Sequence, residues 1–230
     1  MDDLLREQLA YYRARAEEYD DSIQGIGCTD HAQSQYDDAN REWTSITNAL
    51  RGLAPLGEVL ELACGTGVWT QELISISNSV TAIDGSPEMI RINKEKVGVK
   101  AIEHQCMDLF QWEPERQYDF VFFSFWLSHV PPSHVSDFLS KVVRATKPGG
   151  RVFIVDEPRS DSNISGPNTD GLYQQRTLRD GTSFRIVKAY YDPEEIELEF
   201  LKHGFERHSS MVGKAFFYLC VARDEYTPVM

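Results

Sequence analysis

Residues 59–67 read Val-Leu-Glu-Leu-Ala-Cys-Gly-Thr-Gly, and this stretch constrains the fold more than any other part of the chain. The apolar residues 59–62 predict a short buried strand, and residues 68–76 predict the helix that follows it. Gly65 and Gly67 have no Cβ, so the backbone can turn tightly there and approach a ligand closely. Strand, glycine turn and helix form the first unit of a ligand-binding α/β sheet. An ordinary strand-to-helix turn is the alternative.

A second apolar stretch, residues 80–83, predicts the next strand, which ends at Asp84. This carboxylate follows the glycines by about 20 residues, the position at which open α/β sheets bind a ribose diol. An ionised carboxylate accepts hydrogen bonds from both hydroxyl groups of such a diol. Asp84 is therefore a candidate ligand-binding residue, with a turn or capping role as the alternative.

Four segments together resemble the class I (Rossmann-like) S-adenosylmethionine-dependent methyltransferases that act on small molecules. Residues 61–67 resemble the first motif of that family, and Asp84 resembles its ribose-binding acid. Residues 106–109 resemble its adenine-binding segment, and residues 147–151 resemble the turn before its fifth strand. The resemblance covers residues 55–157.

Two positions depart from the family pattern. Glu61 stands where Asp is commoner, and Ala63 stands where Gly is commoner. Because the charge and the small size are kept, both departures leave the implied cofactor unchanged.

The resemblance implies an α/β fold, with a doubly wound and mostly parallel seven-stranded sheet in the order 3-2-1-4-5-7-6 and an antiparallel last strand. An N-terminal helical lid and an inserted hairpin cap complete this expected fold. The implied cofactor is S-adenosyl-L-methionine. The residues expected to bind it are Tyr19, Glu61, Ala63, Gly65, Gly67, Asp84, Gly85, Met89, Asp108, Leu109 and Ser124.

A chain of 230 residues predicts one domain with a full core. Within it we expect a helical lid at residues 1–53 and the cofactor-binding core at residues 54–158. A cap insertion is expected at residues 159–192, followed by a helix and a strand pair at residues 193–230.

The lid is predicted from residues 3–19, whose apolar side chains recur at helical spacing. Tyr12 and Tyr19 lie on the apolar face, and residues 11–20 resemble the lid that many small-molecule methyltransferases fold over the cofactor. Tyrosine combines an aromatic ring with a hydroxyl group, which suits a sulfonium ligand. For Tyr12 we expect a role in substrate binding, with a place in the plain core as the alternative.

Residues 21–36 are polar and predict a loop, and a second helix is expected to start at Asp37 or Asp38. Cys28 and His31 in this loop invite a metal site. Structural zinc needs four ligands, however, and no second pair is evident in the sequence, so we expect no metal.

The strongest predicted strand is residues 118–125, which are continuously apolar, as in a central parallel strand. It leads to Trp126 and His129, at the sheet edge where ligands of open α/β sheets bind. His129 is the first candidate for a general base, since its unperturbed pKa of about 6.5 suits proton transfer. A structural His129 is the alternative, and Trp126 either walls a substrate pocket or simply packs.

The fifth strand, predicted at residues 151–155, delivers Glu157 to the same edge as the second candidate base. The turn at residues 179–182 predicts a hairpin in the cap insertion. Residues 205–211 and 215–222 predict a final antiparallel strand pair.

The formal charge of −13 repels nucleic acid and anionic membranes, so neither is an expected partner. The four cysteines are not spaced as a disulfide framework, and no stretch reaches the roughly 20 apolar residues of a membrane span. A cytoplasmic enzyme with a small-molecule substrate is therefore expected.

The predicted function is methyl transfer by in-line displacement to an oxygen or nitrogen nucleophile of a small molecule. Another S-adenosylmethionine-using transferase, such as an aminopropyl transferase, and a non-catalytic cofactor-binding subunit are the alternatives. A nicotinamide-dependent reductase shares the strand, turn and acid, but its fingerprint needs Gly where this chain has Thr70.

Overall fold

A seven-stranded sheet forms the centre of the computed structural model, which describes residues 2–23, 33–98, 102–160, 169–170 and 172–225. Its strand order is β3-β2-β1-β4-β5-β10-β9, and β10 runs antiparallel to both of its neighbours. Counted within this sheet alone, this is the predicted order 3-2-1-4-5-7-6 with an antiparallel last strand, so the predicted fold is confirmed. The strands are β1 (Glu58–Leu62), β2 (Ser79–Asp84), β3 (Ile102–Cys106), β4 (Tyr118–Ser124), β5 (Thr146–Asp156), β9 (Phe205–Val212) and β10 (Phe217–Arg223).

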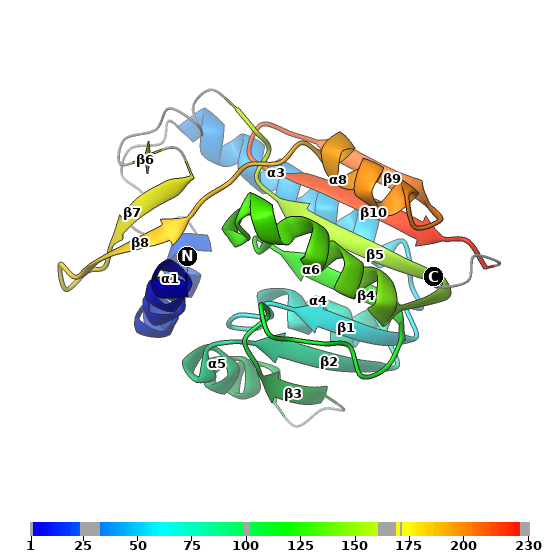
Figure 1. Ribbon diagram of the computed structural model, residues 1–230, viewed down its shortest axis with the longest axis horizontal. Coiled ribbons are helices and arrows are strands. Elements are labelled where there is room, and N and C mark those ends of the chain that lie inside the picture. Colours follow the sequence, from blue (N-terminus) through cyan, green and yellow to red (C-terminus); the bar gives the residue numbers. More distant parts are fainter. Residues whose placement is uncertain (1, 24–32, 99–101, 161–168, 171, 226–230) are drawn as a thin grey trace.

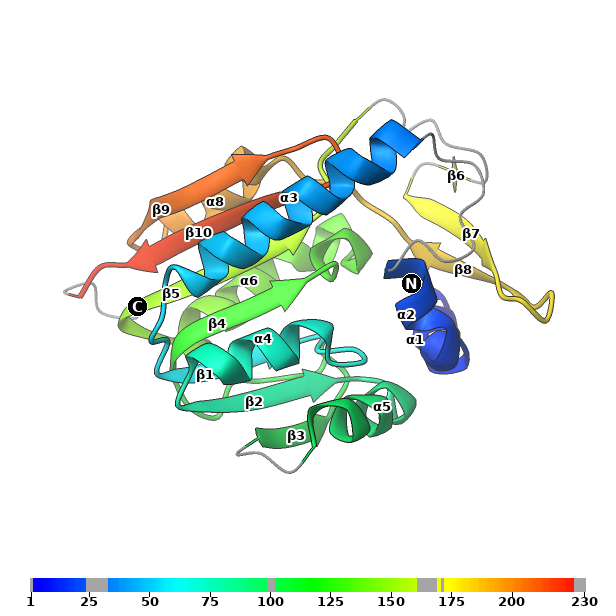
Figure 2. The same cartoon turned by 180° about the vertical axis from the view of Figure 1, so that it is seen from behind.

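Helices cover both faces of this sheet, as Figures 1 and 2 show from opposite sides. One face carries α6 (Pro132–Ala145) and α8 (Pro193–Leu201), and the other carries α3 (Gln33–Arg51), α4 (Val68–Ile76) and α5 (Pro87–Val97). Alternating residues of β4 supply both layers of the core. Val121 and Phe123 pack on the α6 side, whereas Phe120 and Phe122 pack on the α4 side. A central strand buried on both faces is continuously apolar for this reason.

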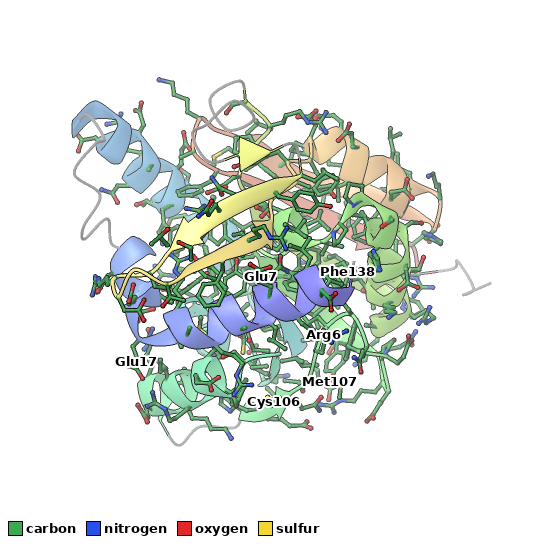
Figure 3. All side chains as sticks on the ribbon, turned by 60° about the vertical axis from the view of Figure 1, so that its left-hand side comes forward. Arg6, Glu7, Glu17, Cys106, Met107 and Phe138 are labelled. Atoms are coloured by element: carbon green, nitrogen blue, oxygen red, sulfur yellow. The ribbon has the colours of Figure 1, made fainter. Side chains whose placement is uncertain are left out.

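The N-terminal segment and a small second sheet lie together at one end of the large sheet (Figures 1 and 2). The segment consists of α1 (Asp2–Arg15), the 3-10 turn η1 (Ala16–Glu18) and α2 (Tyr19–Ile23). The second sheet contains β6 (Thr169–Asp170), β7 (Tyr173–Thr177) and β8 (Ser183–Val187). In Figure 3, α1 runs across the front of the molecule beneath the β7–β8 hairpin, with Glu7 next to β8.

Three predicted boundaries are wrong. The helix expected over residues 3–19 changes direction after Arg15, where η1 begins. Helix α3 starts at Gln33 and not at Asp37 or Asp38, because no glycine or proline interrupts the preceding turn. Strand β5 starts at Thr146, before the expected residue 151, because Thr146 already pairs with Tyr118 ahead of a register shift.

Two further sequence expectations concern metal binding and membrane spanning. Cys28 and His31, the weak metal candidates, lie outside the described residues. Among the described helices, none has the length and apolar character that crossing a bilayer requires.

Ion pairs fasten the N-terminal segment to the rest of the molecule. Arg13 pairs with Glu88 of α5 at 3.0 Å, and Asp20 pairs with Lys96 of the same helix at 2.6 Å. On the other side, Glu7 accepts from the backbone N–H of Arg185 in β8 at 2.6 Å. These side chains are partly exposed, so salt screens their attraction.

We therefore expect salt to loosen this segment before it loosens the sheet. Raising the ionic strength from about 0.05 to 0.5 M shortens the Debye length severalfold and should speed amide hydrogen exchange in residues 2–23 by a few-fold. Exchange measured by mass spectrometry checks this, with helix α6, which packs on the large sheet, as the internal control. Equal acceleration in both segments, or none in residues 2–23, contradicts the prediction.

Candidate active site

A cavity of about 690 Å³, counting its open mouth, lies at the carboxyl ends of β1, β2 and β4 beneath α1. Its position agrees with the rule that open α/β sheets bind ligands at this edge. Most of the predicted site residues line it, namely Tyr12, Tyr19, Ala63, Gly65, Asp84, Gly85, Met89, Asp108, Leu109, Ser124, Trp126 and His129. The sequence prediction missed five other lining residues: Leu5, Gln8, Leu9, Phe110 and Phe125.

The glycine turn between β1 and α4 uses three residues with positive φ, Ala63 (54°), Gly65 (50°) and Gly67 (91°). A Cβ on Gly65 would meet only the Tyr19 ring, at 3.9 Å, so this glycine faces the cavity. A Cβ on Gly67 would lie 2.9 Å from Asn93 Cγ, so Gly67 is needed for packing against α5. Ala63 adopts a conformation that favours glycine, which explains why glycine is commoner than alanine at this position in the family.

The carboxylate of Asp84 closes the turn from the end of β2. Its Oδ2 accepts a hydrogen bond from the Gly65 N–H at 2.9 Å, and its Oδ1 accepts one from the Ser86 N–H at 2.8 Å. Burial raises the pKa of Asp84, and the two amide hydrogen bonds oppose that rise. Each oxygen keeps a second lone pair, so the group can still accept hydrogen bonds from a diol in the cavity.

Glu61 lies beneath the turn and does not line the cavity. Its side chain is 2% exposed and accepts a hydrogen bond from the Thr70 hydroxyl at 2.6 Å. Burial raises the pKa of Glu61 to about 8, against the opposing effect of the Thr70 hydrogen bond. The carboxyl group therefore holds a proton over much of the neutral range.

Asp108 and Leu109 border the cavity after β3. Asp108 Oδ1 accepts a hydrogen bond from the Phe110 N–H at 3.0 Å, so the side chain also caps its own turn. At the neighbouring Gly85, a Cβ would lie 3.2 Å from Leu9 Cδ1 of α1. This close approach shows how tightly α1 is seated over the end of β2.

Asp20 of α2 connects the N-terminal segment to the glycine turn. Its Oδ1 accepts a hydrogen bond from the Thr66 hydroxyl at 2.5 Å, while its Oδ2 contacts Lys96 Nζ at 2.6 Å. The adjacent Tyr19 lines the cavity, and burial raises its pKa to about 12. Tyr19 therefore stays neutral at physiological pH.

His129 is held at both ring nitrogens. The Val187 carbonyl, which can only accept, lies 2.7 Å from Nδ1, so Nδ1 carries a hydrogen. Burial, followed by the charge of Lys188, lowers the pKa of His129 well below its usual value, so the ring is neutral. Its Nε2 therefore accepts the hydrogen bond from the Tyr12 hydroxyl, at 2.7 Å. The Tyr12 hydroxyl thus occupies the nitrogen that was expected to act as the base.

Gln8 of α1 holds this pair in place, and the sequence prediction did not include it. Its side-chain Nε2 donates to the His129 carbonyl at 3.1 Å, and its Oε1 accepts from the Val187 N–H at 2.9 Å. Gln8 is 2% exposed, although glutamine is usually at the surface. Its position between Leu5 and Leu9 on the apolar face of α1 was the available sequence signal.

Glu157, the second candidate base, does not line the cavity. Its Oε2 lies 2.6 Å from Nζ of the buried Lys188, and Lys188 also donates to the Ser128 hydroxyl at 3.1 Å. The preceding residue, Asp156, was not predicted. It is buried and accepts from the Ser128 N–H at 3.0 Å, so it fixes the turn that carries His129.

Trp126 lines the cavity and packs against Phe110, with the ring centroids 5.3 Å apart. Its indole Nε1 is buried and has no partner among the described residues. Together with Tyr12 and His129 it forms one end of the cavity, which we call the acceptor end. We call the part of the cavity that is lined by Asp84 and Asp108 the cofactor end.

The shifted pKa of Glu61 predicts how pH changes the stability of the ligand-free protein. The folded state keeps a proton that the unfolded chain releases above about pH 4.5, so stability falls as pH rises from about 4.5 to about 8. Glu61→Gln keeps the acceptor for Thr70 and does not titrate. We expect it to melt at least about 3 °C higher than the unmodified protein at pH 8.5, and the difference to shrink at pH 5.

Thermal melting at a series of pH values tests this, with Glu206→Gln on the exposed edge of β9 as the control. The control should show a difference that does not change with pH. A Glu61→Gln difference that is constant from pH 5 to 8.5, or that grows toward acid, contradicts the assignment.

Comparison with known proteins agrees with this geometry. The family model described as "Methyltransferase domain" matches residues 59–150. A solved structure described as a DhpI-SAM-HEP complex shares 37% sequence identity, covers 96% of this chain and 97% of its own, and has a TM-score of 0.78. A DhpI-SAH complex gives 36% identity over the same shares of both chains, with a TM-score of 0.77.

A curated relative supports the same family at lower identity. The ubiquinone/menaquinone biosynthesis C-methyltransferase UbiE of Pseudomonas aeruginosa (strain LESB58) is 24% identical over 196 residues. The match covers 76% of this chain and 75% of the relative.

The residues of the cavity fit S-adenosyl-L-methionine. Asp84 keeps lone pairs that ribose hydroxyls could use, Gly65 leaves open space at the turn, and the Asp108 carboxylate is a further acceptor in the same cavity. The sheet order, the cavity and the likeness to cofactor-bound relatives lead to one assignment. The chain belongs to the class I S-adenosylmethionine-dependent methyltransferases, and S-adenosyl-L-methionine is its cofactor.

Proposed function

We propose that this methyltransferase acts on a small-molecule acceptor, through an oxygen or nitrogen nucleophile, at the acceptor end of the cavity. The observation that carries the proposal is the Tyr12–His129 pair, which lines the same cavity as the residues of the cofactor end. Such a space fits a metabolite, since α1 covers it and the hairpin packs against α1. The residues expected to bind the cofactor are those that line the cofactor end, with Glu61 and Gly67 shaping the turn from beneath.

The bound cofactor supplies an activated methyl group on a sulfonium, so the chain itself mainly orients the two reactants. Trp126 and Phe110 form an apolar wall that positions the acceptor, and α1 excludes water from above. Exclusion of water strengthens the electrostatic interactions inside the site.

We propose a two-step proton path in which Tyr12 contacts the acceptor and His129 lies behind it. The proton leaving the nucleophile passes to the Tyr12 oxygen, while the Tyr12 hydroxyl proton passes to His129 Nε2. The low pKa of His129 keeps Nε2 unprotonated at neutral pH and thus ready to receive it. In this role His129 acts through Tyr12, and Glu157, paired with Lys188, has no direct part.

We also propose that residues 1–53 act as a lid and residues 159–192 as a cap within one domain. Supporting this, α1 reaches over the cavity with Leu5, Leu9 and Tyr12. The hairpin then holds α1 from the other side through Gln8 and Glu7. In this proposal α1, together with the hairpin that holds it, moves for ligands to enter or leave, while α3 stays packed on the sheet.

The role of Asp84 predicts a loss of cofactor affinity in Asp84→Asn. The variant keeps one acceptor oxygen but loses the charge, so hydrogen bonds to a charged group worth about 1.5–3 kcal/mol are weakened. We expect S-adenosylhomocysteine to bind at least about tenfold more weakly by calorimetric titration. Glu103→Gln on exposed β3 is the control, with NADH as the control ligand. Unchanged affinity in Asp84→Asn would exclude Asp84 from the cofactor site.

The proton path predicts that Tyr12→Phe lowers kcat by about 10²-fold, the lower range for general acid–base catalysis. Cofactor affinity should stay within about twofold. The matched control is Tyr11→Phe, whose hydroxyl contacts Arg15 and not His129. Production of S-adenosylhomocysteine with a panel of small alcohols, acids and amines measures both variants.

The pH profile separates a proton path from simple packing. Protonation of His129 at acid pH blocks the path, so activity of the unmodified enzyme should fall as the pH drops below the lowered His129 pKa. Tyr12→Phe should lose this acid limb. A Tyr12→Phe variant that keeps full kcat and the same profile would show that Tyr12 only packs.

A further inference from the structure

Strand β7 points two polar side chains inward, and among the described residues each of them keeps one buried atom without a hydrogen-bond partner. Gln174 and Arg176 are half-buried, while Tyr173, Gln175 and Thr177 on the other face of the strand are exposed. The Nε of Arg176 and the Oε1 of Gln174 are buried and have no hydrogen-bond partner. Within the described residues, no carboxylate pairs with the Arg176 guanidinium.

These two side chains lie on the face of the hairpin that packs toward Tyr12, and neither of them lines the cavity itself. In the hairpin register Arg176 is opposite Phe184 and Gln174 is opposite Ile186. Both opposite residues belong to the apolar cluster that contains Tyr12. The inward face of the hairpin therefore meets α1 at the turn of helix that carries Tyr12.

Electrostatic effects place the guanidinium in the same neighbourhood. Burial dominates the pKa shifts of Tyr12 and His129, raising the first and lowering the second. The charge of Arg176 contributes to both, opposing the rise for Tyr12 and adding to the fall for His129. Arg176 thus acts on both members of the proposed proton path.

Other cations of this region have carboxylate partners. Lys188 pairs with Glu157 at 2.6 Å, Arg185 pairs with Glu7 at 3.2 Å, and Arg179 pairs with Asp21 at 2.6 Å. Arg179 and Arg185 are exposed and still have carboxylate partners, whereas Arg176 is half-buried and has none among the described residues. A guanidinium that is partly removed from water without a counter-ion is costly, and a bound anion removes that cost.

We propose that Arg176 and Gln174 bind an oxyanion group of the methyl acceptor, so that the enzyme acts on small anionic molecules. A planar guanidinium donates in parallel to two oxygens of a carboxylate or a phosphoryl group. The Gln174 amide can turn its NH₂ toward the same oxygens. The oxyanion serves as a handle, while the nucleophile lies near Tyr12. This inference rests on the proposed function, because it names the class of its acceptor.

Because the chain is negatively charged overall, a preference for anionic acceptors has to come from short-range contacts in the site. A protein of formal charge −13 repels anions at long range. Only a desolvated cation at short range can then favour an anionic acceptor over a neutral one. The rest of the acceptor, beside Trp126 and Phe110, is expected to be apolar or planar.

The first experiment measures anion binding without any acceptor. Protein saturated with S-adenosylhomocysteine is titrated calorimetrically with sodium acetate and, separately, with inorganic phosphate at constant ionic strength. We expect at least one ion to bind in the millimolar range, and Arg176→Met to weaken it by at least about tenfold. Arg176→Lys keeps the charge but loses the planar guanidinium, so its anion affinity should lie between those of the unmodified protein and Arg176→Met.

Arg185→Met is the matched control, since it removes the same charge from the exposed face of the same hairpin. It should leave anion affinity within about twofold. Binding of acetate alone points to carboxylate acceptors, and binding of phosphate alone points to phosphoryl-type acceptors. If neither ion binds, or if Arg176→Met and Arg185→Met behave alike, the proposal is wrong. Unchanged S-adenosylhomocysteine affinity in Arg176→Met shows that the variant is folded.

The second experiment compares acids with their neutral amides as acceptors, following S-adenosylhomocysteine formation. We expect turnover of acids only, with KM raised at least about tenfold in Arg176→Met. Turnover of the amides by both proteins would overturn the anionic acceptor and leave methyl transfer to small molecules standing. Failure of every small molecule, with anion binding still dependent on Arg176, would instead count against the proposed function.

Discussion

The contact on which the site depends most is the one between the Asp84 carboxylate and two backbone amides. By accepting from Gly65 and Ser86, Asp84 ties the turn after β1 to the helix start after β2. Two neighbouring parallel strands thereby end at a fixed distance, with the remaining lone pairs of the carboxylate aimed into the cavity. Asn93, which donates to the Gly65 carbonyl at 3.3 Å, supports the same positive-φ turn from the side of α5. Asp84 thus shapes the cofactor end and also offers it a binding group.

The acceptor end is built differently, from segments that are distant in sequence. Tyr12 and His129 are 117 residues apart, and Gln8 and Val187 are 179 residues apart. The loops of the large sheet supply His129, Trp126 and Phe110, whereas α1 supplies Tyr12 and Gln8 and is held in place by the hairpin. The rigid part of the fold therefore holds the cofactor side, and the added segments determine what else can enter.

This division also explains how much the sequence could predict. The glycine turn, Asp84 and the buried strands follow from local patterns, and the sheet order followed from the family resemblance. The residues of the cofactor end could be predicted because parallel strands end at the same edge of a sheet, so the residues that follow them lie close together. Gln8, Asp156 and Arg176 were missed because each matters only through a partner far along the chain. Glu61 and Gly67 were predicted to bind the cofactor, but neither lines the cavity: Glu61 is buried under the turn and Gly67 packs against Asn93.

The buried Gln8 side chain spans the lid, the His129 loop and the hairpin at once. Its two hydrogen bonds exist only while α1 is seated, and so does the contact of Tyr12 with His129. Lifting α1 to admit or release a molecule therefore takes the proton path apart. On the proposed proton path, an enzyme with α1 lifted could exchange ligands but could not react, so a molecule in transit would not meet an assembled reaction centre.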